Sequence, residues 1–273
     1  MLRDDQIERY SRQIILPNVG GKGQEKILKA KVLIIGAGGL GSPCALYLAS
    51  AGVGKIGIVD SDAVEVNNLQ RQVLHSTLTV GKSKVESAKE RINAINPDVN
   101  VVPYKLRLSS ENILEIIKDY DIIVDGSDNF PTRYLVNDAC VISKRPLSHG
   151  GIFRYDGQAI TILPNESACY RCLFPEPPPA GLVPSCQEAG ILGAVAGVIG
   201  VIQANEVLKF ILRTGNLLAG KLLVFNALDS TFRQVKVPRD PKCPVCGEKP
   251  TITKLIDYQE FCNLKSKSDR SIK

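Results

Sequence analysis

Three glycines and one acidic residue stand directly after two short apolar runs of the chain. Gly36, Gly38 and Gly41 have G-x-G-x-x-G spacing and follow the apolar run 32–35. Glycines let the backbone approach a phosphate closely, and the N-terminus of a following helix offers N–H groups to an anion. The next apolar run ends at Asp60, whose carboxylate can accept hydrogen bonds from ribose hydroxyls. The pattern therefore predicts a nucleotide at this turn.

Amide and charged side chains continue the pattern beyond Asp60, in the segment DSDAVEVNNLQRQ. In an open α/β sheet, ligands bind outside the carboxyl ends of the strands, and an arginine there can bind phosphate oxygens with two hydrogen bonds. The next helix adds a second cation, for which Lys84 is predicted and Lys82 is equally compatible by position. From the segment itself we predict binding contributions from Asp62, Asn67, Asn68, Leu69, Gln70 and Arg71.

Two further carboxylates follow a later apolar run, in the segment DIIVDGSDNFPTR. Asp125 and Asp128 both fall at the carboxyl end of the predicted strand. Mg²⁺ binds one or two protein carboxylates together with the phosphate oxygens of a nucleotide, so Asp128 is a candidate ligand and Asp125 could share that role. The alternative is that Asp128 caps a helix that begins near Pro131.

The chain contains eight cysteines, four of them in two Cys-x-x-Cys pairs, Cys169/Cys172 and Cys243/Cys246. Two such pairs are typical of a tetrahedral zinc site in which each pair binds from one tight turn. The interval between the pairs is longer than in a zinc finger. Because sulfur would fill all four positions, the zinc would be structural rather than catalytic.

The other cysteines differ in their sequence surroundings. Cys44 and Cys140 stand at helical positions and are most simply buried thiols of the core. Cys186 follows a proline-rich segment and precedes a helix predicted from Gly190. A thiol near a helix N-terminus has a lowered pKa and can act as a nucleophile, whereas the neighbouring Glu188 opposes that effect. A reactive and an unreactive Cys186 both remain open.

Apolar runs alternate with helical stretches over residues 31–150. Near-continuous apolar strands separated by helices indicate a parallel sheet covered on both faces. Beyond this region, 157–164 and 221–237 are typical of antiparallel strands and a hairpin, and a helix is predicted over 190–214. We therefore predict an α/β fold with a Rossmann-like, mostly parallel sheet continued by antiparallel strands, helices on both faces and a Cys₄ zinc knuckle.

Composition sets limits on the class of protein. Hydrophobic residues make up 44% of the chain, enough for a sizeable core, and the net charge of +6 is too mild to argue for nucleic acid. The opening residues MLRDDQIERYSRQ do not resemble a secretory signal. The longest apolar stretch, Ile191 to Ile202, is too short to span a bilayer. We expect a cytoplasmic protein without membrane contact.

The motifs together closely resemble the MoeB/ThiF/HesA family, which is related to the ubiquitin-activating enzymes. The resemblance covers about residues 3–262. It implies a homodimer that adenylates the C-terminal glycine carboxylate of a small ubiquitin-like sulfur carrier of the MoaD or ThiS type, consuming Mg·ATP and releasing pyrophosphate. The carrier would then form a thiocarboxylate for molybdopterin or thiamin synthesis. The matching segments are, in order, RYSRQIIL, GAGGLGSP, NLQRQ, GKSKVESA, DGSDNFPTRY, CYRCLFP and CPVCG.

The resemblance also implies roles for individual residues. Gly39 lies beside the phosphates, Asp60 binds the ribose, and Asp128 binds Mg²⁺ with Asn129 beside it. Arg12 resembles an arginine that reaches the phosphates of the other subunit in the dimer. The phosphate contacts of the family match Asn68, Arg71 and Lys84, and its zinc ligands match Cys169, Cys172, Cys243 and Cys246.

Cys186 matches a position that, in some members of the family, bonds covalently to the carrier and in others is dispensable. No rhodanese segment is found in the sequence, so we expect a separate sulfur donor, a cysteine desulfurase or a rhodanese. An adenylation needs no catalytic histidine, and His75 and His149 have no ligand or triad companion at motif spacing. We predict that both histidines are structural.

The resemblance also sets the expected domain organisation. We predict a single adenylation domain over 1–262, with a helical prelude at 1–30, a nucleotide-binding half at 31–150 and a carrier-binding and zinc half at 151–262. Residues 263–273 are predicted to be a disordered tail.

Three alternatives compete with this interpretation. An NAD-dependent oxidoreductase would use the same glycine turn and Asp60, but no acid or base for hydride transfer accompanies them, whereas Arg71, Lys84 and Asp128 suit a triphosphate and a metal. A relative that adenylates a tRNA-bound carboxylate is disfavoured by the cysteine pairs and by the lack of a large basic surface. A non-catalytic nucleotide-binding scaffold is the third.

Overall fold

The computed structural model describes residues 1–178 and 189–256. One eight-stranded sheet runs through both predicted halves of the chain, in the order β3-β2-β1-β4-β5-β6-β7-β8. The first five strands in this order are parallel, and β6, β7 and β8 continue the sheet antiparallel. The strands are β1 (Lys31–Ile35), β2 (Lys55–Val59), β3 (Asn100–Tyr104), β4 (Ile122–Asp125), β5 (Leu147–Phe153), β6 (Asp156–Ile162), β7 (Lys221–Asn226) and β8 (Thr231–Lys236).

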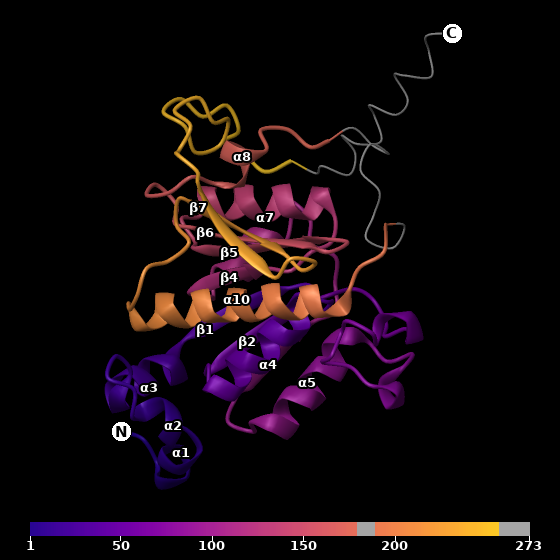
Figure 1. The fold of residues 1–273 in the computed structure, drawn as a ribbon, viewed down its shortest axis with the longest axis vertical. Helices are drawn as coiled ribbons and strands as arrows, with labels where there is room; N and C mark the ends of the chain where they lie inside the picture. The colour runs from indigo at the N-terminus through magenta and orange to yellow at the C-terminus, as the bar shows by residue number, and fades with distance from the viewer. Residues whose placement is uncertain (179–188, 257–273) are drawn as a thin grey trace.

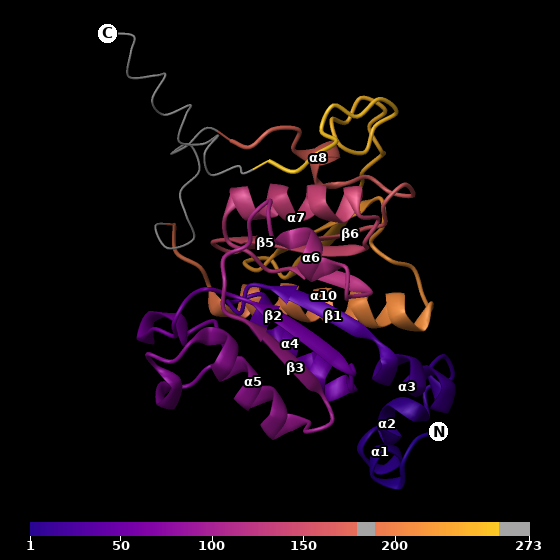
Figure 2. The same cartoon turned by 180° about the vertical axis from the view of Figure 1, so that it is seen from behind.

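Helices cover both faces of this sheet. Figures 1 and 2 show α4, α5 and α10 on one face and α6 and α7 on the other. The predicted fold class is therefore confirmed. The helices are α1 (Asp4–Arg9), α2 (Ser11–Ile14), α3 (Gly20–Lys29), α4 (Gly41–Ala51), α5 (Lys84–Ile95), α6 (Ile113–Ile117), α7 (Phe130–Ile142), α8 (Tyr170–Leu173) and α10 (Gly193–Leu212), with 3₁₀ turns η1 (Val66–Asn68) and η2 (Thr77–Thr79).

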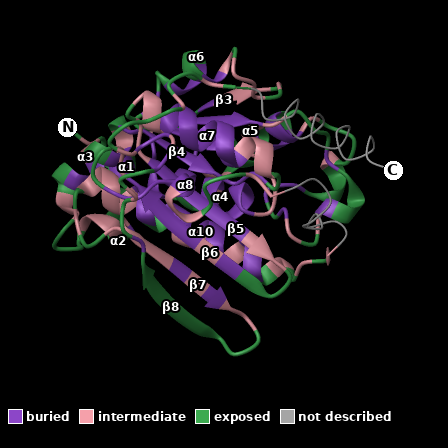
Figure 3. Ribbon diagram, turned by 90° about the horizontal axis from the view of Figure 1, so that it is seen from above, coloured by how far each residue is buried: buried purple, intermediate pink, exposed green. Residues whose placement is uncertain are grey.

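The apolar strands of the parallel half are buried on both sides, as Figure 3 shows in purple. Val32 and Ile34 of β1 point into a core cluster shared with α4, α5 and α10. Leu33 and Ile35 point into a second cluster shared with α6 and α7. Because successive side chains of a strand face opposite sides, a strand between two helical layers must be apolar at every position. The edge strand β8 is exposed throughout, which fits its polar sequence.

The sequence left the segment around 146–151 without an assignment, and the structure places β5 there. β5 pairs parallel with β4 and antiparallel with β6, so the sheet changes direction at this strand. Its sequence contains adjacent glycines, Gly150 and Gly151, which lower strand propensity. Gly150 faces the side chain of Gln203 from α10: a Cβ there would stand 2.6 Å from Gln203 Oε1.

Helix α10 lies across the sheet and packs against α4, β5 and β6 (Figure 1). By length and composition alone this helix could cross a membrane, because it extends beyond the apolar stretch 191–202 and includes Gln203 and Glu206. Its polar side chains bond to the sheet and its connections instead. Gln203 Nε2 donates to the carbonyl oxygens of Asp125 and Ser148, and Glu206 accepts from Thr161 Oγ1. These contacts make α10 part of the core.

Candidate nucleotide cleft and cysteine cluster

A cleft of about 230 Å³ opens where β1 and β2 end at their carboxyl edge. The glycine turn after β1, the segment after β2, the start of α5 and the loops after β3 and β4 form its walls. This is the position in an open α/β sheet where ligands bind. The sequence-predicted residues that line the cleft are Gly36, Gly38, Gly39, Asp60, Asp62, Arg71, Lys84, Asp128 and Asn129.

The glycine turn depends on close backbone contacts. Gly36 has φ +92°, and a Cβ there would stand 3.0 Å from the carbonyl oxygen of Gly126 in the neighbouring loop. Gly41, the first residue of α4, does not line the cleft. A Cβ at Gly41 would stand 1.8 Å from the carbonyl oxygen of Gly36, so this glycine lets α4 pack against the turn.

Asp60 connects the end of β2 to the glycine turn. Its Oδ2 accepts a hydrogen bond from the N–H of Ala37, and its Oδ1 accepts one from the N–H of Asp62, both at 2.9 Å. Burial raises the pKa of the Asp60 carboxyl above its ordinary value, and the charge of the nearby Lys84 opposes that rise. Asp60 therefore orders the turn as well as lining the cleft.

The two lysines that the sequence left open lie in different surroundings. Lys84 is 6% exposed and lines the cleft, with its Nζ 2.9 Å from Asp62 Oδ2. Lys82 is not among the lining residues, and its Nζ lies 2.7 Å from Glu90 Oε1 on the surface. Lys84 is thus the lysine that could meet a bound anion.

Arg71 crosses the glycine turn. A Cβ at Gly39 would stand 3.5 Å from Arg71 Cγ, so the aliphatic part of the arginine covers this glycine. The guanidinium Nη1 donates to the carbonyl oxygen of Asn67 at 3.0 Å, which orients the side chain along the cleft. An arginine held in this way can present further N–H groups to a phosphate.

Several predicted binding residues do not line the cleft. Asn68 is buried, and its Oδ1 accepts from the N–H of Glu65 at 3.2 Å, so its side chain stabilises the 3₁₀ turn. The Gln70 backbone packs against Gly193 at the start of α10. Arg12 is exposed on α2. The predicted residues outside the lining are Gly41, Asn67, Asn68, Leu69, Gln70 and Arg12.

The two carboxylates near the end of β4, Asp125 and Asp128, lie in different surroundings. Asp128 is exposed and lines the cleft, while Asn129 caps α7 by accepting from the N–H of Thr132 at 3.0 Å. The alternative in which Asp128 caps the helix is therefore wrong. Asp125 is fully buried and does not line the cleft; its Oδ2 lies 2.8 Å from His149 Nδ1.

Both histidines are buried and hydrogen-bonded, which agrees with the structural role predicted for them. His75 Nδ1 lies 2.9 Å from Ser87 Oγ, and His75 Nε2 lies 3.0 Å from the carbonyl oxygen of Ala37. This ring therefore connects α5 to the glycine turn. Burial lowers the pKa of His75 below its ordinary value.

Some lining residues were not predicted. Arg107 follows β3 at the same edge of the sheet, flanked by Leu106 and Leu108, which give the cleft an apolar wall. Arg133 comes from the first turn of α7. It is part of the segment DGSDNFPTRY, but the sequence predicts no binding role for it. Arg107 lies in no sequence motif, and only the folded loop brings its side chain to the cleft. Ser127, also a lining residue, has a buried hydroxyl without a partner among the described residues.

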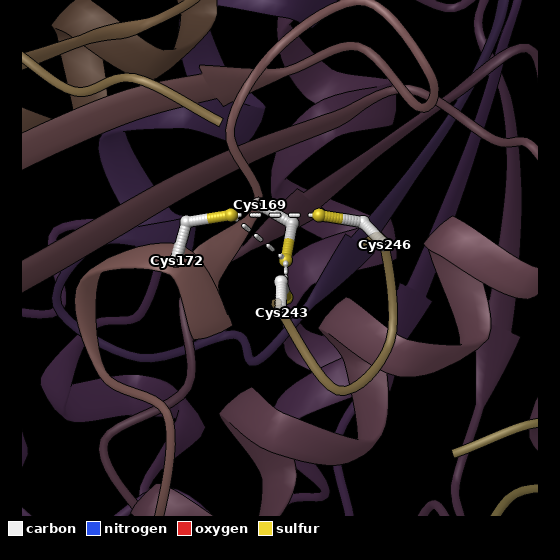
Figure 4. A group of neighbouring side chains, drawn as sticks. All are labelled: Cys169, Cys172, Cys243 and Cys246. Atoms are coloured by element: carbon white, nitrogen blue, oxygen red, sulfur yellow. Dashed lines mark hydrogen bonds between the residues drawn. The ribbon is translucent and has the colours of Figure 1, made fainter. Parts of the chain in front are cut away.

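The four cysteines of the two Cys-x-x-Cys pairs belong to the core cluster that α7 shares with the sheet. Figure 4 shows them gathered together. The Sγ atoms of Cys169 and Cys243 are 3.6 Å apart and those of Cys172 and Cys246 are 3.4 Å apart, and all four lie within 4.8 Å of one another. Tetrahedral zinc with Zn–S bonds of about 2.3 Å places its sulfurs roughly 3.8 Å apart. The cluster therefore fits a structural zinc ion and joins α8 to the segment after β8.

Comparison with known proteins places the chain in a family. A model of the ThiF family matches residues 10–245. The chain belongs to the ThiF family. It is 52% identical over 266 residues to a sulfur carrier protein adenylyltransferase of Thermus thermophilus, covering 96% of this chain and 98% of that protein. It is 48% identical over 258 residues to the SAMP-activating enzyme E1 of Haloferax volcanii, covering 94% and 95%. The predicted family is confirmed, as is the enzyme class of nucleotidyltransferase.

Other relatives of this ThiF-family chain are longer. It is 49% identical over 262 residues to the adenylyltransferase and sulfurtransferase MOCS3 of Sus scrofa, covering 96% of this chain and 58% of that protein. The chain thus spans less than two thirds of the length of this relative. Among solved structures, Escherichia coli MccB crystallised with ATP has a TM-score of 0.77 and 27% identity, covering 87% of this chain and 74% of that one.

Proposed function

We propose that this ThiF-family enzyme adenylates the C-terminal glycine carboxylate of a ubiquitin-like sulfur carrier of the MoaD or ThiS type. The substrates would be Mg·ATP and the carrier, and the products a carrier acyl-adenylate and pyrophosphate. The observation that carries the proposal is the gathering of Arg71, Lys84 and Asp128 around a glycine turn in one cleft. The names of the relatives, which are adenylyltransferases and carrier-activating enzymes, supply the substrate class.

The reaction needs charge stabilisation more than acid–base catalysis. A carboxylate is already ionised at neutral pH, so it can attack the α-phosphorus of ATP without a protein base. Negative charge then builds on the phosphoryl oxygens, and positioned cations stabilise it. Arg71 and Lys84 would supply that charge, and Arg107 and Arg133 add two further cations to the lining.

Mg²⁺ would be held by Asp128. The fit rests on its exposure at the cleft: its carboxylate has only one weak side-chain contact among the described residues, 3.4 Å from Asn129 Nδ2, so its oxygens can bind a hard cation. When bound, the ion neutralises charge on the phosphates. The zinc ion would be held by the four clustered cysteines and would be structural.

ATP–pyrophosphate exchange with a panel of carriers that end in Gly-Gly tests the proposal. We expect exchange only with a matching carrier, and a loss of about a hundredfold or more in Arg71→Ala and Asp128→Ala. Asp229→Asn, on the exposed turn between β7 and β8, is the matched control and should exchange at the wild-type rate. Background exchange with every carrier would instead support a nucleotide-binding scaffold, and tight NADH binding by calorimetry would support an oxidoreductase.

The dimer and the role of Arg12 form part of the same proposal. Arg12 is exposed on α2 and does not line the cleft of its own chain, so it can act only from a second subunit. Co-expression of Arg12→Ala with Arg71→Ala tests whether Arg12 acts in the cleft of the other subunit. If Arg12 acts across a homodimer, one site of each mixed dimer is intact and about a quarter of the exchange activity returns. No recovery in the mixture would contradict action across the dimer, and wild-type exchange by Arg12→Ala alone would place Arg12 outside the reaction.

The remaining proposals concern sulfur transfer and location. Cys186 lies outside the described residues, as does the predicted tail 263–273. We propose that the Cys186 thiolate attacks the carbonyl carbon of the carrier acyl-adenylate and displaces AMP to form a thioester. A thiol-labile adduct in the wild type that is absent in Cys186→Ser supports this, and an unchanged adduct contradicts it. A cysteine desulfurase or a rhodanese would donate the sulfur. We further propose a cytoplasmic location, without nucleic acid or membrane as a partner.

A further inference from the structure

The buried pair of Asp125 and His149 lies directly behind the loop that carries Asp128. Asp125 is the last residue of β4, and His149 stands opposite it on β5 in the parallel register. Asp125 is fully buried and His149 is 2% exposed, with His149 Nδ1 2.8 Å from Asp125 Oδ2. Neither Asp125 nor His149 lines the cleft, but Gly126 and Ser127, which directly follow Asp125 in the chain, do.

The second carboxylate oxygen of Asp125, Oδ1, is hydrogen-bonded to the loop that follows β4. Asp125 Oδ1 accepts from the N–H of Ser127 at 3.0 Å, and the Arg133 guanidinium donates to the carbonyl oxygen of Ser127 at 3.3 Å. Ser127 is therefore fixed on both sides, by its N–H and by its carbonyl oxygen. Since Asp128 follows immediately, these two bonds determine where its carboxylate enters the cleft.

His149 in turn orients the Asp125 carboxylate. The imidazole is packed against the ring of Tyr170, with centroids 4.7 Å apart, so it has little freedom to rotate. Burial would raise the pKa of Asp125, but the hydrogen bond and charge of His149 and the other neighbours hold that pKa below its ordinary value. Removing the Nδ1 donor leaves a buried carboxylate oxygen unpaired, which is unfavourable and favours rotation of the carboxylate.

We infer that His149 is a positioning residue: acting through Asp125, it fixes Ser127 and so sets the position of Asp128 in the cleft. The role of Asp128 itself rests on the proposed function. Groups behind the residues that bind a metal typically change its affinity by 10–100-fold when they are removed. His149 is therefore more than a structural histidine of the core.

Three substitutions separate this role from simple packing. His149→Asn keeps an N–H donor at the place of Nδ1, His149→Gln moves the donor to the place of Nε2, and His149→Leu removes it. We expect the leucine and glutamine variants to raise the Mg²⁺ concentration for half-maximal exchange about tenfold, and the asparagine variant to stay within about threefold of wild type. Thr161→Val is the control, because it removes a buried hydrogen bond of β6 away from the cleft.

Hydrogen exchange gives a second readout that does not depend on activity. In the protein without nucleotide, amide exchange of the loop 126–129 should be faster in His149→Leu and His149→Gln than in wild type, and unchanged in His149→Asn and Thr161→Val. If His149→Leu does not fold, the polar His149→Gln decides. Equal loop exchange and equal Mg²⁺ dependence in the glutamine variant and wild type would overturn the inference. A wild-type protein without pyrophosphate exchange would overturn the proposed function, whereas the loop measurement would still decide the role of His149.

Discussion

The ammonium group of Lys84 lies 2.9 Å from Asp62 Oδ2, and only 8% of the Lys84 side chain is exposed. Two residues earlier, Lys82 has 41% of its side chain exposed and pairs with Glu90. The two lysines thus differ in burial and in partner although they are only two residues apart in sequence. Substituting each lysine in turn therefore compares a buried cation of the cleft with an exposed one.

Lys84→Met should lower ATP–pyrophosphate exchange by about a hundredfold, because it removes a positioned cation from a partly water-excluded site. Lys82→Met removes the same charge from the surface and should leave exchange within about twofold of wild type, since exposed ion pairs contribute little. Steady-state kinetics of both variants, with thermal unfolding to verify the fold, makes the comparison. An exchange rate of Lys84→Met within about twofold of wild type would remove Lys84 from the reaction.

Gly41→Ala should destabilise the protein, because the new Cβ would stand 1.8 Å from the carbonyl oxygen of Gly36 and both groups are backbone. We expect the free energy of unfolding to fall by about 3 kcal/mol, together with loss of nucleotide binding as the turn is displaced. Gly21→Ala is the control, because its nearest contact is a flexible leucine tip 4.0 Å away. It should change the free energy of unfolding by less than about 1 kcal/mol. Denaturant unfolding and ATP calorimetry check both variants; a fully stable Gly41→Ala protein would contradict the close contact.

Zinc should bind in a ratio of about one ion per chain, and Cys172→Ser should lose it. The cluster joins α8 to the segment after β8, so metal loss should lower the free energy of unfolding by at least about 2 kcal/mol. Elemental analysis and chemical denaturation measure the two effects. Cys140→Ala changes a buried thiol outside the cluster and should keep the zinc. Full zinc content in Cys172→Ser would show that the cysteines do not hold the metal.

Stability should fall below pH 6.5 through His75. Burial lowers the pKa of this histidine from 6.5, so between that value and the folded-state pKa the unfolded chain binds more protons than the folded chain. Its contribution is therefore fully present above pH 6.5 and is lost as the pH falls, with a slope of up to about 1.4 kcal/mol per pH unit. His75→Gln, which can still donate to Ala37, should flatten that slope in denaturant unfolding between pH 7.5 and 5.5. Identical slopes in the two proteins would contradict the assignment.

Much of the fold could be predicted because it depends on local patterns. The apolar runs at 32–35 and 122–124 are buried on both faces, and their all-apolar composition reflects that requirement. The strand at Leu147–Phe153 could not be predicted in the same way, because its glycines lower strand propensity and its place depends on packing against Gln203.

The candidate site was predicted less completely, since spacing along the chain does not fix where a side chain points. Asn68 and Arg71 stand in one motif, yet Asn68 is turned inward to its own turn while Arg71 reaches the cleft. Arg107 carries no motif and reaches the same cleft through the folding of its loop. Hydrogen bonds made within the fold decide these directions.

By itself, the sequence determined the strands and helices of the parallel half other than β5, the glycine turn and the two cysteine pairs, because each of these depends on residue type and short-range spacing. Only the tertiary structure placed Cys169 beside Cys243, and Asp128 and Lys84, rather than Asp125 and Lys82, in the lining of the cleft. Those outcomes depend on contacts between segments far apart in the chain, and the packing of the whole sheet and its helices determines them.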